Sequence, residues 1–248
     1  MPSSTEKKTA MVTGAAGTLG LVVTKALLER GMRVVMADVD QKRLDELSAS
    51  LPGETFPFAF NLGDPAQVKA AWTRIEAAVG GVDVLVNNAG ILTNNKLETT
   101  CSEEWRRVID VNVNGVFYLS QLVVPGMKAR RWGRIINTSS LAAKTGGITA
   151  GTAYSTSKGA VISFTFSLAA ELAPFGITVN GIAPAYVRTP MVTEQLSEAQ
   201  RAEVMAKIPV GRFCEPEEFA HVVLFLVDDK AGFITGEIID QNGGLHFD

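Results

Sequence analysis

Short apolar segments alternate with longer amphipathic segments along nearly the whole chain. The first apolar segment, 9–13, is followed by a helical pattern over about 19–30 and by a second apolar segment at 33–38. Short apolar runs bounded by turn residues are typical of strands, and a 3.6-residue period is typical of helices. The chain therefore begins with a predicted strand, helix and strand.

The same alternation continues to the C-terminal end. Further strands are predicted at 56–60, 82–86, 134–138, 177–182 and 237–240, and helices at 41–50, 102–130 and 152–174. This order predicts an α/β fold, a doubly wound parallel sheet of about seven strands with helices on both faces. In such sheets ligands bind beyond the carboxyl ends of the strands.

The domain organisation follows from the continuity of this pattern. No Pro/Ser-rich linker, low-complexity tract or internal repeat interrupts it, so residues 1–248 are expected to form a single domain. The polar helical stretch 191–207 is a candidate lid over a substrate. A plain surface helical hairpin is the alternative for that stretch.

Composition and charge exclude several classes of protein. Hydrophobic residues make up 46% of the 248 residues. The net charge is -3, so the chain lacks the excess of basic residues that is typical of nucleic-acid-binding proteins. The polar segment 1–8 does not fit a signal peptide, and no apolar run approaches the length of a membrane span. Two cysteines and two histidines are too few for a disulfide framework or a convincing zinc site. We expect a soluble, cytoplasmic protein without a metal or a membrane partner.

A glycine-rich loop follows the first strand and opens the first helix. Its sequence is Gly14-Ala15-Ala16-Gly17-Thr18-Leu19-Gly20. Glycines allow a tight turn and let the backbone approach a pyrophosphate, which then lies at the helix N-terminus. Such a loop alone is often only a turn, but an acidic residue also ends the next strand here. The combination predicts a dinucleotide site in a Rossmann fold.

The acidic residue is Asp38, and it bears on the choice of cofactor. A carboxylate at this position accepts hydrogen bonds from the adenosine ribose hydroxyls and repels a 2′-phosphate. Ala16 and Gly17 in the loop offer no cation to a 2′-phosphate. The alternative for Asp38, or for Asp40, is the N-cap of the next helix. We expect NAD rather than NADP.

Tyr154 and Lys158 lie four residues apart in a predicted helix, so their side chains are neighbours on one face. A nearby ammonium favours the phenolate and is expected to lower the pKa of Tyr154 below its ordinary value of about 10. Such a phenol exchanges protons with an alcohol or carbonyl near neutral pH. An ordinary surface pair has the same spacing, so the interpretation depends on the other motifs.

Taken together, the motifs resemble those of the short-chain dehydrogenase/reductase family, from the first strand nearly to the end of the chain. The order of these motifs and their positions at strand ends make the resemblance specific. Beyond the glycine-rich loop, Tyr154 and Lys158, it rests on Asn87-Asn88-Ala89-Gly90, Val111-Asn112-Val113, Ser139-Ser140, Pro184 with Thr189, and Ile234-Thr235-Gly236.

The resemblance implies a catalytic set of Asn112, Ser140, Tyr154 and Lys158. Tyr154 would exchange a proton with the substrate oxygen, Ser140 would hydrogen-bond that oxygen, and Lys158 would hold the nicotinamide ribose. Asn112 would help to position a water that links Lys158 to solvent, although a helix cap is its alternative role. Ser140 is preferred to Ser139 because the second serine matches the family position. Hydride passes from the nicotinamide, so the chemistry needs no metal.

The resemblance also implies the cofactor contacts. Thr189 would bind the nicotinamide carboxamide beside the backbone of Val187, and Asn88 would support the sheet near the adenine ribose. The full implied set is Gly14, Gly17, Thr18, Leu19, Gly20, Asp38, Asn61, Leu62, Asn88, Ala89, Gly90, Tyr154, Lys158, Pro184, Val187 and Thr189.

Three positions depart from the family pattern. Thr18 replaces a glycine, and it either crowds the pyrophosphate or binds it through its hydroxyl and N–H; we favour binding. Asn61 stands where an Asp commonly contacts the adenine amino group, and an amide oxygen accepts the same bond more weakly. Ala185 replaces a glycine after Pro184, which is expected to stiffen that turn.

The substrate is the least determined part of the prediction. Asp38 favours an NAD-dependent dehydrogenase that oxidises a secondary alcohol, polyol or sugar, because cells keep NAD largely oxidised. The alternative is a reductase of 3-oxoacyl thioesters on acyl carrier protein, which residues 208–244 resemble. That subfamily implies NADPH and a basic docking surface; Arg131 is available for it, but Phe175 replaces a cation common there. A regulatory relative that binds NAD without turnover is a third possibility.

Two further expectations concern charges near the substrate and assembly. Lys144 is the one obvious cation in the loop 141–153, and Arg188 is either an anchor for an anionic substrate or a merely exposed residue. The helices 102–130 and 152–174 carry more small and apolar residues than one sheet face needs, so we expect a homo-oligomer, a dimer or a homotetramer.

Overall fold

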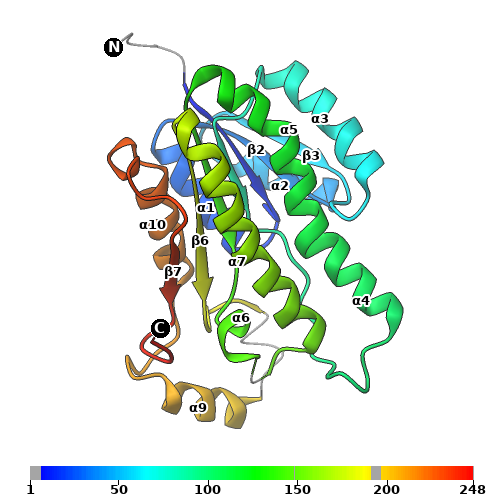
Figure 1. Cartoon of the computed structure of the whole chain (residues 1–248), viewed down its shortest axis with the longest axis vertical. Coiled ribbons are helices and arrows are strands. Elements are labelled where there is room, and N and C mark those ends of the chain that lie inside the picture. Colours follow the sequence, from blue (N-terminus) through cyan, green and yellow to red (C-terminus); the bar gives the residue numbers. More distant parts are fainter. Residues whose placement is uncertain (1–6, 148, 191–196, 248) are drawn as a thin grey trace.

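The fold is a seven-stranded parallel sheet covered by helices on both faces (Figure 1). A computed structural model describes residues 7–147, 149–190 and 197–247. The strand order is β3-β2-β1-β4-β5-β6-β7, and every neighbouring pair is parallel. The predicted doubly wound α/β fold is confirmed. The strands are β1 (Thr9–Thr13), β2 (Arg33–Asp38), β3 (Thr55–Ala59), β4 (Val84–Asn87), β5 (Gly133–Thr138), β6 (Ile177–Pro184) and β7 (Ile238–Gln241).

Helices connect the strands and cover the two faces of the sheet. They are α1 (Thr18–Glu29), α2 (Gln41–Ser50), α3 (Pro65–Val79), α4 (Ser102–Ile109), α5 (Gly115–Arg130), α6 (Ala142–Thr145), α7 (Thr152–Leu172), α9 (Glu198–Lys207) and α10 (Pro216–Val227). Short 3-10 turns, η2 (Ala173–Phe175) and η3 (Asp229–Ala231), follow α7 and α10. Each predicted strand or helix boundary lies within two residues of the observed one.

The core lies in two layers because alternate residues of each strand face opposite sides of the sheet. Val12 and Met36 pack with side chains from α1, α2 and α10, whereas Met11 and Val35 pack with α3, α5 and α7. All four side chains are fully buried. Burial on both faces explains why these strands are apolar along their whole length rather than alternating.

Two aspartates cap the N-termini of helices. The Asp40 side chain accepts a hydrogen bond from Arg43 N at the start of α2, and Asp64 accepts bonds from Ala66 N and Gln67 N at the start of α3. Asp40 is therefore the N-cap that the sequence allowed for either Asp38 or Asp40. This assignment leaves the Asp38 carboxylate available for another role.

Helices α4 and α5 form one continuous helical rod, Ser102–Arg130, with a π-helical segment, η1 (Asp110–Asn114), between them. By length and composition alone this rod is apolar enough to cross a membrane, which corrects the expectation that no apolar run approaches that length. The rod packs against α3, α7 and the strands β4 and β5. Figure 1 shows α5 and α7 side by side on the same face of the sheet.

The candidate lid falls only partly in the described chain. Residues 191–196 lie outside the described residues, and α9 covers Glu198–Lys207. Helices α6 and α9 lie at the end of the sheet toward which the arrows of β6 and β7 point (Figure 1). Both helices therefore lie at the carboxyl ends of the strands, where a ligand site is expected.

Candidate active site

One cleft at the carboxyl ends of the strands brings most of the predicted site residues together. Its volume is about 460 Å³. Of the predicted residues, only Asn61, Leu62 and Asn112 do not line it. The lining residues are Gly14, Gly17, Thr18, Leu19, Gly20, Asp38, Asn88, Ala89, Gly90, Leu92, Thr138, Ser139, Ser140, Tyr154, Lys158, Pro184, Ala185, Val187, Thr189 and Pro190.

The glycine-rich loop packs tightly against the start of α1. Gly14 has a left-handed backbone (φ 66°), and a Cβ on Gly20 would lie 2.1 Å from the Gly14 carbonyl oxygen. Gly17 occupies the N-cap position of α1, and no side chain caps this helix. Since the first N–H groups of a helix lack intrahelical partners, they are free to bind an anion such as a pyrophosphate. Thr18 is half-buried and faces the cleft at this point.

Asp38 is held in place at the end of β2. Its Oδ2 accepts a hydrogen bond from Ala16 N at 3.0 Å, and its Oδ1 accepts one from Val39 N at 2.7 Å. The carboxylate thus lies directly beside the glycine-rich loop. Of the residues that line the cleft in the described part of the chain, Lys158 is the one Lys or Arg. This end of the cleft therefore presents a negative charge and no cation.

The loop after β4 is tied to β1 by a residue that the sequence did not single out. The Thr13 hydroxyl oxygen accepts hydrogen bonds from the backbone N–H groups of Asn88 (3.0 Å) and Ala89 (2.9 Å), and Asn88 Nδ2 donates to the Thr13 carbonyl (2.9 Å). These bonds hold Asn88, Ala89 and Gly90 against the cleft. Asn88 therefore has the structural role that was expected of it.

Lys158 lies under the cleft with its ammonium buried. Its Nζ donates a hydrogen bond to the Thr138 carbonyl at 2.7 Å and lies 5.7 Å from the centre of the Tyr154 ring. Burial lowers the pKa of Lys158 to about 8. The amine is therefore mostly protonated at neutral pH and loses its charge just above it.

The expected lowering of the pKa of Tyr154 is wrong for this structure. Burial raises the pKa of the phenol above its ordinary value, and a hydrogen bond with the Ser140 side chain acts in the opposite direction. The ammonium of Lys158 is directed to the Thr138 carbonyl and lies over the Tyr154 ring, so it does not offset the loss of solvation. Tyr154 is accordingly a protonated phenol at neutral pH.

The two serines after β5 have different surroundings. Ser139 Oγ donates to the Lys158 carbonyl at 2.9 Å and is buried, so this side chain holds α7 against the end of the strand. Ser140 Oγ accepts a hydrogen bond from Ala142 N at 3.2 Å, and its side chain also bonds Tyr154. Ser140 therefore belongs with Tyr154 in the cleft, as the sequence predicts.

Asn112 lies in the π-helical segment, fully buried beneath the cleft. Its Oδ1 accepts a hydrogen bond from Ile91 N, and its Nδ2 donates to the Ile91 carbonyl and to Ser157 Oγ, at 2.9–3.0 Å. The side chain thus joins the loop after β4 to α7 and caps no helix. A Cβ on Gly90 would lie 3.3 Å from both Asn112 Oδ1 and Lys158 Nζ, so a larger residue there would press on both groups.

Two predicted cofactor residues lie elsewhere. Asn61 Oδ1 accepts a hydrogen bond from Gly63 N at 2.9 Å, and Asn61 lines a separate hollow with Arg106 and Asp110. Leu62 packs against Gly115, where an added Cβ would lie 2.9 Å from Leu62 Cβ. The structure does not bring these two side chains into the cleft. Conversely, Leu92, Thr138 and Pro190 line it, although no polar motif marks Leu92 or Pro190 in the sequence.

The cations expected near the substrate are paired with carboxylates. Arg188 Nε donates to Glu215 Oε1 at 2.9 Å, and Lys144 Nζ donates to Asp240 Oδ2 at 2.6 Å. The Arg188 side chain therefore forms an ion pair at the start of α10 and is not left to bind an anionic substrate. Within the described residues, no group of three or more His, Cys, Asp or Glu side chains could hold a metal ion.

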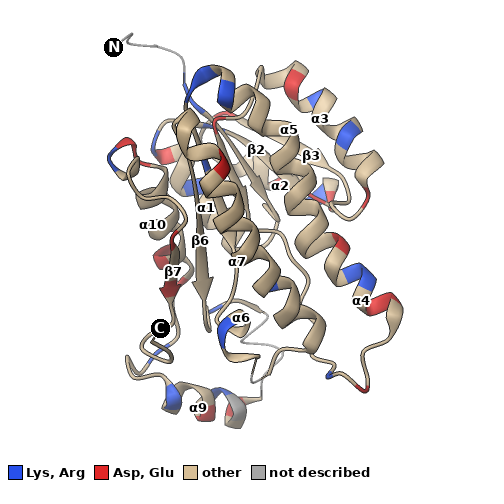
Figure 2. Cartoon of the chain, viewed as in Figure 1, with Lys and Arg blue, Asp and Glu red and all other residues tan. Residues whose placement is uncertain are grey.

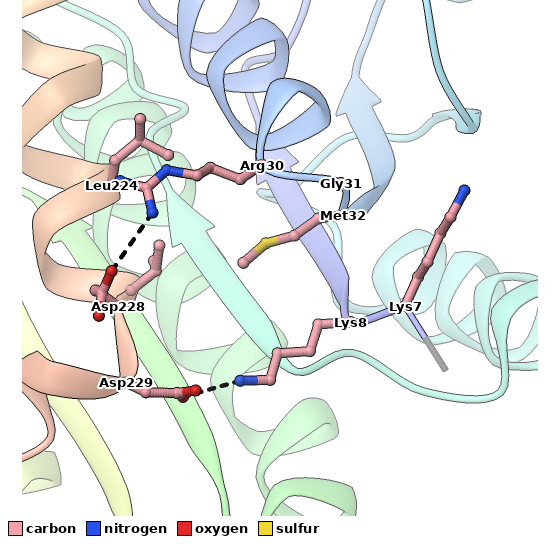
Figure 3. A pocket seen from close by; sticks show the side chains of 9 residues that line it. Lys7, Lys8, Arg30, Gly31, Met32, Leu224, Asp228 and Asp229 are labelled. Atoms are coloured by element: carbon pink, nitrogen blue, oxygen red, sulfur yellow. Dashed lines mark hydrogen bonds and ion pairs between the residues drawn. The ribbon is translucent and has the colours of Figure 1, made fainter. Parts of the chain in front are cut away.

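A second hollow, of about 330 Å³, lies at the opposite end of the sheet (Figure 3). Two ion pairs cross it, Lys8 with Asp229 (2.9 Å) and Arg30 with Asp228 (3.4 Å). These pairs join the starts of β1 and β2 to the end of α10. None of the predicted site residues lies there, so the cleft at the carboxyl ends is the candidate active site.

Comparisons with known proteins show which proteins this chain is similar to. A family model described as Enoyl-(Acyl carrier protein) reductase matches residues 14–246. The chain is 40% identical to 3-oxoacyl-[acyl-carrier-protein] reductase FabG of Thermotoga maritima over 97% of this chain and 98% of that protein. It is 39% identical to the Escherichia coli protein of the same name, with the same coverage. The crystal structure of a 3-oxoacyl-[acyl-carrier protein] reductase from Brucella melitensis superimposes with a TM-score of 0.91, at 34% identity, over 98% of this chain and 92% of that one.

Proposed function

Because the chain belongs to the short-chain dehydrogenase/reductase family, an oxidoreductase family that uses a nicotinamide cofactor, we propose that it reduces 3-oxoacyl thioesters to 3-hydroxyacyl thioesters. The observation that carries this proposal is the similarity, at 36–40% identity over nearly the whole chain, to relatives named 3-oxoacyl-[acyl-carrier-protein] reductase. The preferred expectation, a polyol or sugar dehydrogenase, has no such support. The comparisons favour the alternative.

The cleft supplies a proton donor and a hydrogen bond to the substrate oxygen. A bound reduced nicotinamide supplies a hydride to the C3 carbonyl carbon. Tyr154 donates its phenolic proton to the oxygen as the carbonyl bond is reduced; its raised pKa keeps that proton in place before reaction. The Ser140 hydroxyl, which bonds Tyr154, stabilises the charge that develops on the same oxygen.

Lys158 and Asn112 restore the proton that Tyr154 gives up. The Lys158 ammonium is within the cleft and lies 5.7 Å from the Tyr154 ring centre, close enough to stabilise a phenolate once it forms. Lys158 also holds the nicotinamide ribose in this proposal. Asn112 lies beside Lys158 at Gly90 and helps to position the water that links the lysine to solvent.

The cofactor that we propose is NAD(H). The residues present fit a dinucleotide, since the uncapped start of α1 suits a pyrophosphate and Asp38 suits the ribose hydroxyls. A 2′-phosphate would meet the Asp38 carboxylate without a compensating cation beside it, because Lys158, the one Lys or Arg among the described lining residues, lies over the Tyr154 ring. Thr18 binds the pyrophosphate through its hydroxyl in this proposal, because its side chain lines the cleft at the helix start.

The proposal that acyl carrier protein carries the acyl group rests only on the names of the relatives. Arg131, the candidate for a basic docking surface, precedes β5, whereas Ser140 follows it, and a strand of six residues separates the two ends by about 20 Å. Arg131 also donates to the Pro174 carbonyl, and Phe175 lies 4.7 Å under the Lys128 ammonium. Within one subunit this surface is remote from Tyr154.

A cytoplasmic homo-oligomer, a dimer or tetramer, completes the proposal. Between their ends α5 and α7 carry few charged residues (Figure 2). Phe117 on α5 and Phe166 on α7 are 44% and 49% exposed. Large exposed apolar side chains on neighbouring helices favour burial against another subunit.

A substrate panel read at 340 nm tests the proposed function. We expect turnover of 3-oxobutanoyl thioesters of acyl carrier protein or coenzyme A with NADH, and none with Tyr154→Phe. Turnover of polyols or sugars with NAD, but of no thioester, would instead support a polyol or sugar dehydrogenase. Tight NADH binding without turnover of any compound would identify a binding protein.

A further inference from the structure

Two loops lie against each other beside the catalytic helix. One is the segment after β4 that contains Thr93, Asn95 and Lys96; the other leads into α7. Gly151 N donates to the Thr93 carbonyl at 2.7 Å, and Thr152 N donates to the Asn95 carbonyl at 3.0 Å. A Cβ on Gly151 would lie 2.5 Å from the Asn95 oxygen, so the loops approach as closely as their backbones allow.

Lys96 adds a side-chain link between these loops. Its Nζ donates hydrogen bonds to the Gly147 carbonyl at 3.0 Å and to the Ala150 carbonyl at 2.6 Å. Bonds with a charged donor are stronger than neutral ones. The described partners of this ammonium are neutral carbonyl oxygens, in contrast to the carboxylate partners of Lys144 and Arg188. Lys96 therefore holds the backbone of the second loop rather than another side chain.

Of the two linked residues, Ala150 has a buried side chain, whereas Gly147 has no side chain to anchor it. Gly146 and Gly147 both adopt left-handed backbones (φ 74° and 75°), and neither has a side chain that could pack. A Cβ on Gly147 would lie 2.5 Å from Ser155 Oγ, so the position requires glycine. Glycine residues have the largest backbone freedom to lose on ordering. At Gly147 the bond from Lys96 supplies a restraint that a packed side chain would supply elsewhere.

The position of this loop makes the link relevant to the substrate. Gly147 and Ala150 lie between Ser140 and Tyr154 in the chain, and both of those residues line the cleft. None of the described residues between them lines the cleft itself, so the loop bears on the cleft through its two ends, Ser140 and Tyr154.

We propose that Lys96 is a substrate-positioning residue, which fixes the carbonyls of Gly147 and Ala150 and so holds the loop whose two ends carry Ser140 and Tyr154. It acts through this backbone and does not take part in proton transfer. The inference rests on the proposed function only for the identity of the substrate.

Steady-state kinetics of Lys96→Met test the proposal. We expect the KM for the thioester to rise about five- to tenfold, the factor that one or two hydrogen bonds of ordinary net strength are worth. The kcat and the Kd for NADH should stay within about twofold, because Gly151 N and Thr152 N keep their own bonds and Lys158 keeps its bond to Thr138. Lys96→Arg, which retains a charged donor, should recover most of the lost affinity.

Hydrogen exchange provides a readout without turnover. The amides of Gly147 and Ala150 should exchange faster in Lys96→Met than in the wild type, while those in the body of α7 should not change. Lys69→Met, on the exposed face of α3, is the matched control and should change neither exchange nor KM.

Three results would overturn the proposal. They are a KM within twofold of the wild type, a rise in the Kd for NADH equal to the rise in KM, or unchanged exchange at Gly147 and Ala150. If the wild type reduces no thioester, the proposed function is wrong, but the role of Lys96 can still be tested. The KM of the wild type and of Lys96→Met is then compared with whichever compound is turned over. If no compound is turned over, hydrogen exchange at Gly147 and Ala150 tests the role of Lys96.

Discussion

The choice between NADH and NADPH depends on one carboxylate, and Asp38→Asn isolates its charge. Both Asp38 oxygens accept backbone hydrogen bonds, so the carboxylate has a fixed place beside the glycine-rich loop. Asparagine has nearly the same shape but no charge, and it keeps an amide oxygen that accepts one of these bonds. The substitution therefore changes electrostatics more than geometry.

The magnitude follows from Coulomb's law. A phosphate monoester carries a charge of about −1.5 to −2 near neutral pH. About 4 Å from a carboxylate, it is repelled by roughly 1.5–2 kcal/mol in bulk water and by roughly 6–8 kcal/mol at an effective dielectric constant of about 20. Because Asp38 is half-buried in an open cleft, we expect a value of about 2–4 kcal/mol, or roughly 30- to 1,000-fold in kcat/KM.

The assay compares kcat/KM for NADH and NADPH in the wild type and in Asp38→Asn. The wild type should prefer NADH by at least about 30-fold, and the variant should lose most of that preference, with NADPH improving and NADH weakening by about tenfold. Asp40→Asn is the control, since it removes the same charge two residues away at the cap of α2. It should leave the ratio unchanged. A wild type that prefers NADPH, or an Asp38→Asn ratio equal to that of the wild type, would refute this reasoning.

Four further predictions concern the catalytic residues and the glycine-rich loop. Tyr154→Phe should lower kcat by about 10²- to 10⁴-fold, the range of general acid catalysis, while NADH titration gives a Kd within about twofold; retained turnover would exclude Tyr154 as the proton donor. The rate of reduction should fall as pH rises through about 8, where Lys158 loses its proton, and a pH profile of Lys158→Met should lack that inflection. Because the folded-state pKa of Lys158 lies below its ordinary value of 10.5, the unfolded chain binds more protons between about pH 8 and 10.5. The free energy of unfolding should therefore rise with pH across that window, and urea titrations in which Lys158→Met shows the same rise would contradict the assignment. Gly20→Ala places a Cβ 2.1 Å from the Gly14 carbonyl oxygen, so it should lower the free energy of unfolding by about 1–3 kcal/mol and weaken NADH binding; an unchanged Tm would show that the loop relaxes.

Several parts of the site were predictable because they are short-range. The glycine-rich loop, the acid at the end of β2 and the pair Tyr154 and Lys158 lie within single strand–turn–helix units or within one helical turn. Local spacing and backbone conformation determine such features, and the parallel sheet then gathers the strand ends at one edge. The position of Ser140 near Tyr154 was predictable as well, because Ser140 follows a strand and the strand ends gather at this edge.

Other features depended on how distant segments pack. The family resemblance placed Asn61 and Leu62 at the cofactor, but Asn61 bonds to Gly63 N, Leu62 packs against Gly115, and neither lines the cleft. Thr13 has no motif of its own and becomes important only because the loop after β4 folds against β1. A sequence pattern does not show which backbone groups such a hydroxyl will meet.

The sequence by itself thus determined the strand–helix order and the family, and it predicted the residues that we propose carry the chemistry. Only the tertiary structure decided the electrostatic state of those residues and the link through Lys96. Spacing put Lys158 next to Tyr154, yet burial raised the pKa of the phenol and directed the ammonium to the Thr138 carbonyl. The physical reason is that solvation and hydrogen-bond partners depend on everything packed around a group, whereas periodicity records only its neighbours along the chain.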